Sequence, residues 1–184
     1  MTKHKVFISY HHANDEDYKI EFEEKFEHLF INKSVQDGEY DEDLSDDYIK
    51  RLIQEEKITD CTVVVVLIGT ETYKRKHVDW EISAGISGKV GGRTGLIGIL
   101  LPSYYDSDEN KSLEGAGYKS STIPPRLYDN VETEYAKIYK WSNAIKKNTD
   151  GEYRIKRWID EAFDRKNDDS IKTDNSREQF KRNL

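Results

Sequence analysis

The feature that most constrains the fold is a short, unbroken apolar run in the middle of the chain. From Val63 to Ile68 the sequence reads VVVVLI, and Gly69 and Thr70 end the run. Such a run is typical of a strand covered on both faces, as in the interior of a parallel sheet. Because ligands bind beyond the carboxyl ends of parallel strands, the segment after Ile68 is the first place where we expect chemistry.

Apolar patterns elsewhere predict strands that alternate with helices. Short runs rich in β-branched and aromatic residues predict further strands at Lys5 to Tyr10, Gly95 to Leu101 and Tyr135 to Trp141. Apolar residues at helical spacing predict helices over Tyr18 to Phe30, Tyr48 to Ile58, Val78 to Ser87 and Ile155 to Phe163. This alternation predicts an α/β fold: a flavodoxin-like, doubly wound parallel sheet of about five strands with a C-terminal helix.

The connections between these elements carry more local predictions. Asn14 is the expected cap of the first helix, and Asp15 lies in its first turn, where a carboxylate favours the helix dipole. A short edge strand is expected around Ser34 to Gln36. The stretch from Tyr104 to Pro125 has no apolar period and is too long for a simple connector, so we interpret it as a polar insertion.

The composition favours a compact protein of the cytoplasm. Hydrophobic and charged residues each make up 35% of the 184 residues, so the apolar residues gather in a few runs. No apolar stretch approaches the roughly 20 residues that cross a bilayer. No signal peptide is expected, and the single Cys61 suits a reducing compartment. We expect one domain over residues 1–166, followed by a charged, mobile tail over 167–184.

The charge distribution limits the partners. A net charge of −7 disfavours nucleic acid, since phosphate binding needs a concentrated basic face, and membrane binding is not expected. Acids dominate from Asp15 to Asp60, whereas bases gather from Lys137 to Arg157. Two solvated faces explain this pattern. The alternative is a homo-oligomer in which the acidic face of one copy meets the basic face of the next.

Glu81 is the first candidate for chemistry, because it lies on the helix that follows the central strand. The first and central strands are expected to be neighbours where the strand order reverses, which places the loop from Ser9 to His12 beside Glu81. A carboxylate in a first helical turn also stabilises the helix without any function. His77 and Glu81 share a helical face, but two ligands without a third make a weak zinc site, so no metal is expected.

Three segments together resemble a TIR domain, specifically the bacterial TIR-like group that includes the Thoeris antiphage subunit ThsB. Lys5 to Tyr10, KVFISY, resembles the opening strand of this group, and Thr62 to Thr72 resembles its central strand with the turn after it. Val78 to Ile82, VDWEI, followed by Gly95 to Ile99, is similar to the glutamate helix and the next strand. The resemblance covers about residues 5–106.

The resemblance implies a defence function and an activity. Enzymatic members cleave NAD between nicotinamide and ribose, and Glu81 matches their catalytic position. NAD is then the substrate, and no cofactor is expected. Thoeris-like members are expected to make a cyclised ADP-ribose signal that activates a separate effector protein. The residues expected to form the NAD pocket lie at the first strand end and on the glutamate helix: Phe7, Ser9, Tyr10, His11, His77 and Trp80.

Two departures from the family pattern matter for binding. The family often has tryptophan four residues before the glutamate, where this chain has His77. The loop after the first helix, which often takes part in nucleotide binding and assembly, is acidic from Asp37 to Asp47. Because a pyrophosphate is repelled by carboxylates, we do not assign binding residues to this loop.

A single carboxylate suits this reaction. Ordinary glycosidases need an acid for the leaving oxygen and a second carboxylate. Nicotinamide in NAD is already a cationic pyridinium and leaves as a neutral molecule, so no acid is required. Glu81 would stabilise the positive charge that develops on the ribose. Cyclisation further requires that water is excluded while another atom of the same molecule attacks the ribose.

Two other function classes stay open at this point. The first is a non-catalytic TIR adaptor that acts through homotypic protein contacts. The second is an enzyme that resembles nucleoside deoxyribosyltransferases, which share the fold and the single carboxylate. Release of nicotinamide from NAD, or turnover of deoxynucleosides, distinguishes these classes.

Overall fold

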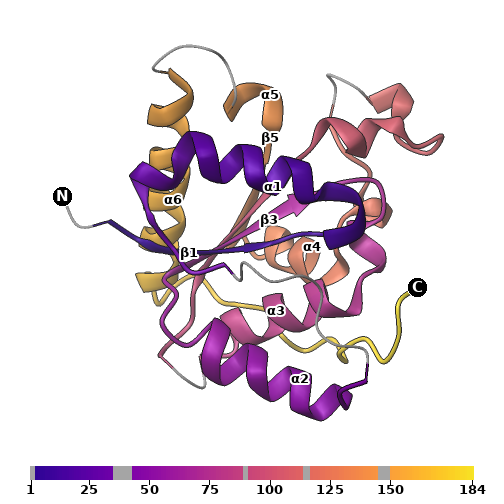
Figure 1. Ribbon diagram of the computed structural model, residues 1–184. Coiled ribbons are helices and arrows are strands. Elements are labelled where there is room, and N and C mark those ends of the chain that lie inside the picture. The colour runs from indigo at the N-terminus through magenta and orange to yellow at the C-terminus, as the bar shows by residue number, and fades with distance from the viewer. Residues whose placement is uncertain (1–2, 35–42, 89–90, 114–116, 145–149) are drawn as a thin grey trace.

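The computed structural model describes residues 3–34, 43–88, 91–113, 117–144 and 150–184. Its centre is a five-stranded, fully parallel sheet with the strand order β2-β1-β3-β4-β5 (Figure 1). The strands are β1 (Lys5–Ser9), β2 (Ile31–Asn32), β3 (Val63–Ile68), β4 (Gly95–Leu100) and β5 (Ala136–Lys140). The predicted flavodoxin-like fold is confirmed.

The order of the strands reverses between β1 and β3. The chain leaves β1 toward the β2 edge and then crosses back to β3, from which it continues toward β5. In the β1–β3 pair Val6 lies opposite Val63 and Ser9 opposite Val66. A crevice between outward-running connections forms at such a point, and this is where open α/β sheets bind ligands.

Helices cover both faces of the sheet. They are α1 (His12–Phe26), α2 (Asp46–Leu52), α3 (Lys76–Ile86), α4 (Pro125–Glu132), α5 (Trp141–Ala144) and α6 (Asp150–Asn167). Helices α2, α3 and α4 pack on one face, and α1, α5 and α6 on the other (Figure 1). Alternate residues of β3 point into the two cores, because side chains alternate across a strand.

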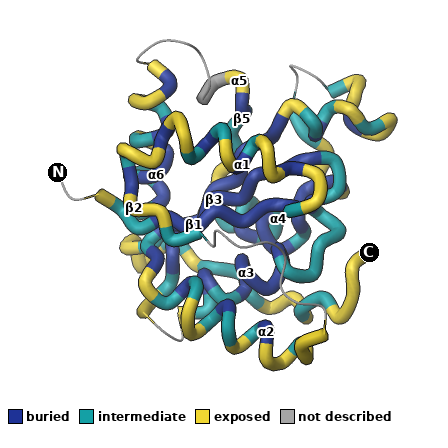
Figure 2. Tube along the Cα trace, in the orientation of Figure 1, coloured by how far each residue is buried: buried dark blue, intermediate teal, exposed yellow. Residues whose placement is uncertain are grey.

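The central strand is the most deeply buried element. Every residue of β3 is fully buried, and the dark strands at the centre of Figure 2 show this burial directly. Each such aliphatic side chain contributes about 1.5–3 kcal/mol when it leaves water. Residues 63–68 are all apolar because both faces of β3 lie under helices, as the sequence predicts.

The structure corrects several local predictions. The edge strand is Ile31–Asn32, and Ser34 is not part of a strand; residues 35 and 36 of the prediction lie outside the described residues, as does most of the acidic loop. Helix α1 begins at His12, so Asn14 is inside it rather than its cap. Asp15 lies in the first turn of α1, as predicted, but it is fully buried. Its carboxylate serves a tertiary contact that local helix rules do not anticipate.

The region expected to be a polar insertion is more structured than its sequence indicates. Short 3-10 turns at 102–106, 111–113 and 120–122 lead into α4, which was not predicted. Tyr104 is fully buried, and its hydroxyl lies 2.7 Å from the hydroxyl of Thr122. A buried aromatic with a satisfied hydroxyl anchors this region to the core on the α4 side.

The last residues of the chain lie against the domain. Helix α6 ends at Asn167, one residue beyond the predicted boundary, and residues 168–184, here called the C-terminal segment, run along α4 and α3 (Figure 1). Mobility of this segment stays a prediction. Within the described residues, no helix is both long and apolar enough to cross a membrane.

Candidate active site

Glu81 and the end of the first strand meet in the interior. The Ser9 hydroxyl, at the last residue of β1, donates a hydrogen bond to Oε2 of Glu81 at 2.5 Å. Both residues are buried: Ser9 is 1% and Glu81 is 4% exposed. A buried carboxylate needs hydrogen-bond donors, and a hydroxyl at the carboxyl end of a strand provides one. The predicted approach of the Ser9 loop to Glu81 is present in the structure.

A second buried carboxylate braces the neighbouring strand ends. Asp15 of α1 accepts hydrogen bonds from the hydroxyl of Ser103, after β4, at 3.0 Å and from that of Thr72, after β3, at 3.4 Å. Burial raises the pKa of Asp15, and these two hydrogen bonds act in the opposite direction. Gly69 lets Asp15 come this close, since a Cβ at Gly69 would stand 2.3 Å from the carboxylate oxygens. The crevice edge is therefore rigidly supported.

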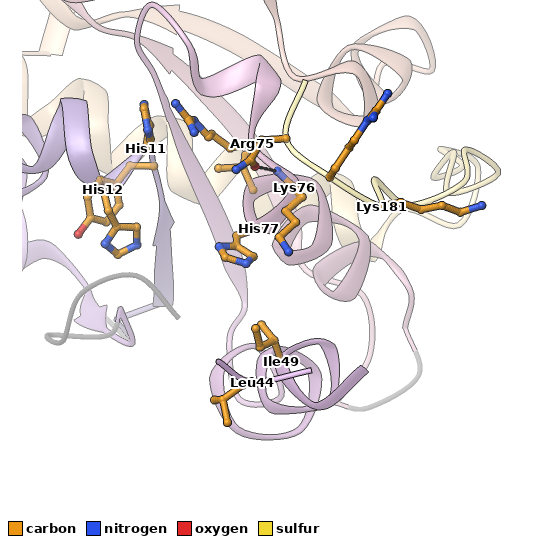
Figure 3. A pocket seen from close by; sticks show the side chains of 12 residues that line it. His11, His12, Leu44, Ile49, Arg75, Lys76, His77 and Lys181 are labelled. Atoms are coloured by element: carbon orange, nitrogen blue, oxygen red, sulfur yellow. Dashed lines mark hydrogen bonds between the residues drawn. The ribbon is translucent and has the colours of Figure 1, made fainter. Parts of the chain in front are cut away.

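A pocket of about 350 Å³ opens next to Glu81. Its volume is at the lower end of the range for small-molecule sites. Figure 3 shows His11 and His12 on one side, Lys181 on the other, and Arg75, Lys76 and His77 between them. Glu81 does not itself line the pocket. The lining includes Tyr10, which follows Ser9 in the chain, and His77 and Val78, which lie about one helical turn before Glu81.

The lining of this pocket is basic, in a chain that is acidic overall. It contains four residues that are cationic at neutral pH: Arg75, Lys76, Lys181 and Arg182. None of the described lining residues is an aspartate or glutamate. Lys76 pairs with Asp46 at 2.8 Å and Arg75 with Glu71 at 3.4 Å, and both acids are partly exposed. The pocket thus offers positive charge to an anionic ligand.

Two histidines of the lining are uncharged at neutral pH. Burial lowers the pKa of His11 to about 4, and the nearby Arg75 acts in the same direction. Burial likewise lowers the pKa of His77 to about 4, assisted by Lys76. Burial raises the pKa of Tyr10, and the negative charge of Glu81 contributes to this shift. The pocket therefore combines neutral aromatic side chains with permanent cations, and Arg75 and Lys76 lie close enough to His11 and His77 to affect their pKa values.

The sequence-predicted binding residues separate into two groups. Tyr10, His11 and His77 line the pocket, and Ser9 holds Glu81. Phe7 lies in the core beneath α2 and α3. Trp80 is buried on another side of α3, where its indole N–H donates to the carbonyl of Phe180. Trp80 lines a different cavity of about 330 Å³ that lies between α2, α3 and the C-terminal segment.

Several lining residues were missed by sequence reasoning. Arg75 is the cap residue of α3 and Lys76 is its first residue, and the basic run Lys74 to Lys76 upstream of the candidate glutamate was a usable signal. Lys181 and Arg182 are about a hundred residues farther along the chain and carried no local signal. Within the described residues, no group of three or more histidine, cysteine or acidic side chains is placed to hold a metal ion.

Comparison with known proteins identifies the family of this domain. A search of curated proteins gave no match. The family described as Thoeris protein ThsB, TIR-like domain, matches residues 7–106, which is more than half of the chain. The matched range runs from within β1 through β3, α3 and β4, so it contains both Ser9 and Glu81. The chain belongs to the family of Thoeris ThsB TIR-like domains.

Proposed function

We propose that this antiphage-defence TIR protein cleaves NAD at the nicotinamide–ribose bond and makes a cyclic ADP-ribose-type signal that activates a separate effector. Glu81 is the proposed catalytic residue. Ser9 is a positioning residue, and Tyr10, His11 and His77 bind the substrate.

One observation carries this proposal. The carboxylate of Glu81 is buried and held at 2.5 Å by Ser9, at the strand-order reversal, beside a pocket whose lining is basic. An acid that only stabilises a helix lies exposed in the first turn of that helix. Such an acid needs no hydrogen-bond donor from a residue 72 positions earlier in the sequence, as Glu81 has in Ser9. Its burial in a crevice supports a role in chemistry, because groups with strongly altered surroundings gather at functional sites.

The charges of the pocket match those of NAD. Its pyrophosphate is anionic and would meet the cations Arg75 and Lys76, while its nicotinamide ring is cationic. The lining also contains His11 and His77, which are neutral at pH 7 and do not repel a pyridinium. As the glycosidic bond breaks, the ionised Glu81 would stabilise the positive charge on the ribose.

Access to Glu81 requires a local movement. Because Glu81 does not line the pocket, the ribose reaches it only if side chains of the lining shift. Closure of these side chains over the bound substrate would then exclude water. Exclusion of water favours attack by another atom of the same molecule, and so favours a cyclic product over hydrolysis.

The proposal is tested by nicotinamide release from NAD. Glu81→Gln keeps the shape of the side chain but removes its charge, so we expect the rate to fall by about 10³-fold or more. Glu152→Gln, which alters an exposed acid on α6, serves as the matched control and keeps full activity. Thermal unfolding followed by circular dichroism shows that both variants are folded. Full activity of Glu81→Gln would remove this residue from the mechanism.

The alternative function is a non-catalytic TIR adaptor that acts by homotypic contacts. The observation that favours it is that Glu81 is not among the residues that line the pocket. An adaptor would release no nicotinamide under any condition and would self-associate in a concentration-dependent way. Sedimentation analysis together with mass spectrometry of metabolites from phage-challenged cells separates the two functions.

A further inference from the structure

We infer that the C-terminal segment forms the second wall of this pocket, and that its Lys181 and Arg182 bind the phosphates of a nucleotide ligand. The segment lies outside the family match, which ends at residue 106. The inference rests on the proposed function for the identity of the nucleotide. It assigns the anion-binding role to a part of the chain that the family match does not contain.

The first part of the segment is fixed to α4. Asn130 of α4 donates to the carbonyl of Asp174 at 2.7 Å and accepts from its backbone N–H at 2.9 Å. Arg177 forms two hydrogen bonds to the carboxylate of Asp129, at 2.7 and 2.8 Å. Paired contacts of this kind fix direction as well as position. The chain therefore leaves α4 along a defined course toward the pocket.

The last part of the segment is fixed to α3. The backbone N–H of Phe180 donates to Asp79 at 2.9 Å, and the carbonyl of Phe180 accepts from the indole of Trp80 at 2.8 Å. Farther on, the side-chain oxygen of Asn183 accepts from the backbone N–H of Lys76 at 3.0 Å. This contact satisfies one of the free N–H groups at the start of α3, whose own cap residue Arg75 makes no side-chain cap.

Lys181 and Arg182 lie between these two anchors. Phe180 and Asn183 hold the backbone on either side, so the two cations are kept at the rim of the pocket. Lys181 pairs with Glu178 at 2.8 Å, but both side chains are about 80% exposed, and such a pair holds its partners only weakly. An incoming phosphate can therefore compete for Lys181.

The charge count supports a phosphate as the ligand. Two of the four permanent cations in the lining come from the C-terminal segment, and two come from the start of α3, namely its cap residue Arg75 and its first residue Lys76. Figure 3 shows Lys181 on the opposite side of the pocket from His11 and His12, with Arg75 and Lys76 between them. A pyrophosphate carries several oxygens that accept hydrogen bonds from cations on more than one side. The two walls together form such an arrangement.

Binding of ADP, compared with adenosine, tests the inference without requiring catalysis. The full chain, the double variant Lys181→Ala/Arg182→Ala and the control Lys172→Ala are titrated with each ligand by calorimetry. Lys172 is an exposed cation of the same segment that does not line the pocket. We expect the double variant to bind ADP about tenfold more weakly than the wild type, with a smaller dependence on salt. Adenosine binding and the Lys172→Ala variant are unchanged.

Each other outcome overturns the inference. Unchanged ADP affinity in the double variant would show that the two cations do not contact phosphate. Tighter ADP binding would mean that the segment obstructs the pocket instead of completing it. Absence of ADP binding by the wild type would exclude a nucleotide pocket here.

The proposed function fails separately. If NAD is not cleaved but ADP binding depends on Lys181 and Arg182, the inference stands and the enzyme assignment falls. If NAD is cleaved, the double variant is expected to raise KM for NAD about tenfold with little change in kcat.

Discussion

Helix α3 carries two buried carboxylates whose surroundings differ. Asp79 is 3% exposed and pairs with the fully buried Arg126 at 2.8 Å, while the backbone N–H of Phe180 donates to it at 2.9 Å. Glu81 is 4% exposed and accepts from the neutral hydroxyl of Ser9. Residues two positions apart point about 200° apart around a helix, so one acid faces α4 and the C-terminal segment, and the other faces β1.

The comparison separates a structural acid from a candidate catalytic one. Asp79 joins three parts of the chain through a full set of partners, and Arg126 also donates to Asn175 at 2.7 Å. Glu81 lies where ligands bind in this fold and has a hydroxyl among its partners. A carboxylate locked by an arginine is poorly suited to stabilise a developing cation. The following predictions test this difference.

The largest expected effect is on stability, at the Asp79 side. Arg126→Met leaves Asp79 as a buried charge without its cation, and we expect the free energy of unfolding to fall by about 3–5 kcal/mol. Urea denaturation measures this loss. Arg177→Ala removes the exposed ion pair with Asp129 and should cost no more than about 1 kcal/mol. Equal effects of the two substitutions would mean that Asp79 is not a structural anchor.

The second largest effect is a dependence of the free energy of unfolding on pH, which arises from His11 in the pocket lining. The folded pKa of His11 is about 4 against 6.5 for the unfolded chain, so between these values the unfolded state binds a proton and the folded state does not. The free energy of unfolding therefore contains a contribution from neutral His11 that is complete above pH 6.5 and is lost as the pH falls to 4, and this loss is no more than about 3 kcal/mol.

His11→Gln removes this contribution and should flatten the curve of unfolding free energy against pH between 6.5 and 4. Urea denaturation at several pH values provides the measurement. His28→Gln, at a histidine that is about half exposed, is the control and should leave the curve unchanged. A His11→Gln curve as steep as that of the wild type would show that burial does not keep His11 neutral.

The smallest effect is on the rate, at the Glu81 side. Ser9→Ala removes the hydroxyl that holds Glu81, and we expect kcat for nicotinamide release to fall about tenfold with KM unchanged. Ser103→Ala, which removes a donor to Asp15 instead, should lower stability but leave kcat unaltered. If both variants lose activity equally, Ser9 acts through general stability of the crevice and not through Glu81.

Local patterns in the sequence determined the architecture. The apolar run at Val63–Ile68 specified a strand covered on both faces, and the alternation of strands and helices predicted the wound sheet that the structure has. Glu81 and the end of β1 could be paired in advance, because the topology places them at one edge of the sheet although they are 72 positions apart. Burial and periodicity are local properties, so they can be read from neighbouring residues.

Only the tertiary structure decided the polar partners. Asp15 lies in the first turn of α1 as predicted, but its burial was not anticipated, and its donor Ser103 is 88 positions away. Likewise the contact of Trp80 with Phe180 joins residues 100 positions apart, and it directs Lys181 and Arg182 to the pocket. A polar side chain shows no period that reveals its partner, and its burial is stable only once distant segments supply the matching hydrogen bonds. The sequence therefore determined where the candidate site lies, and the folded chain determined which charges surround it.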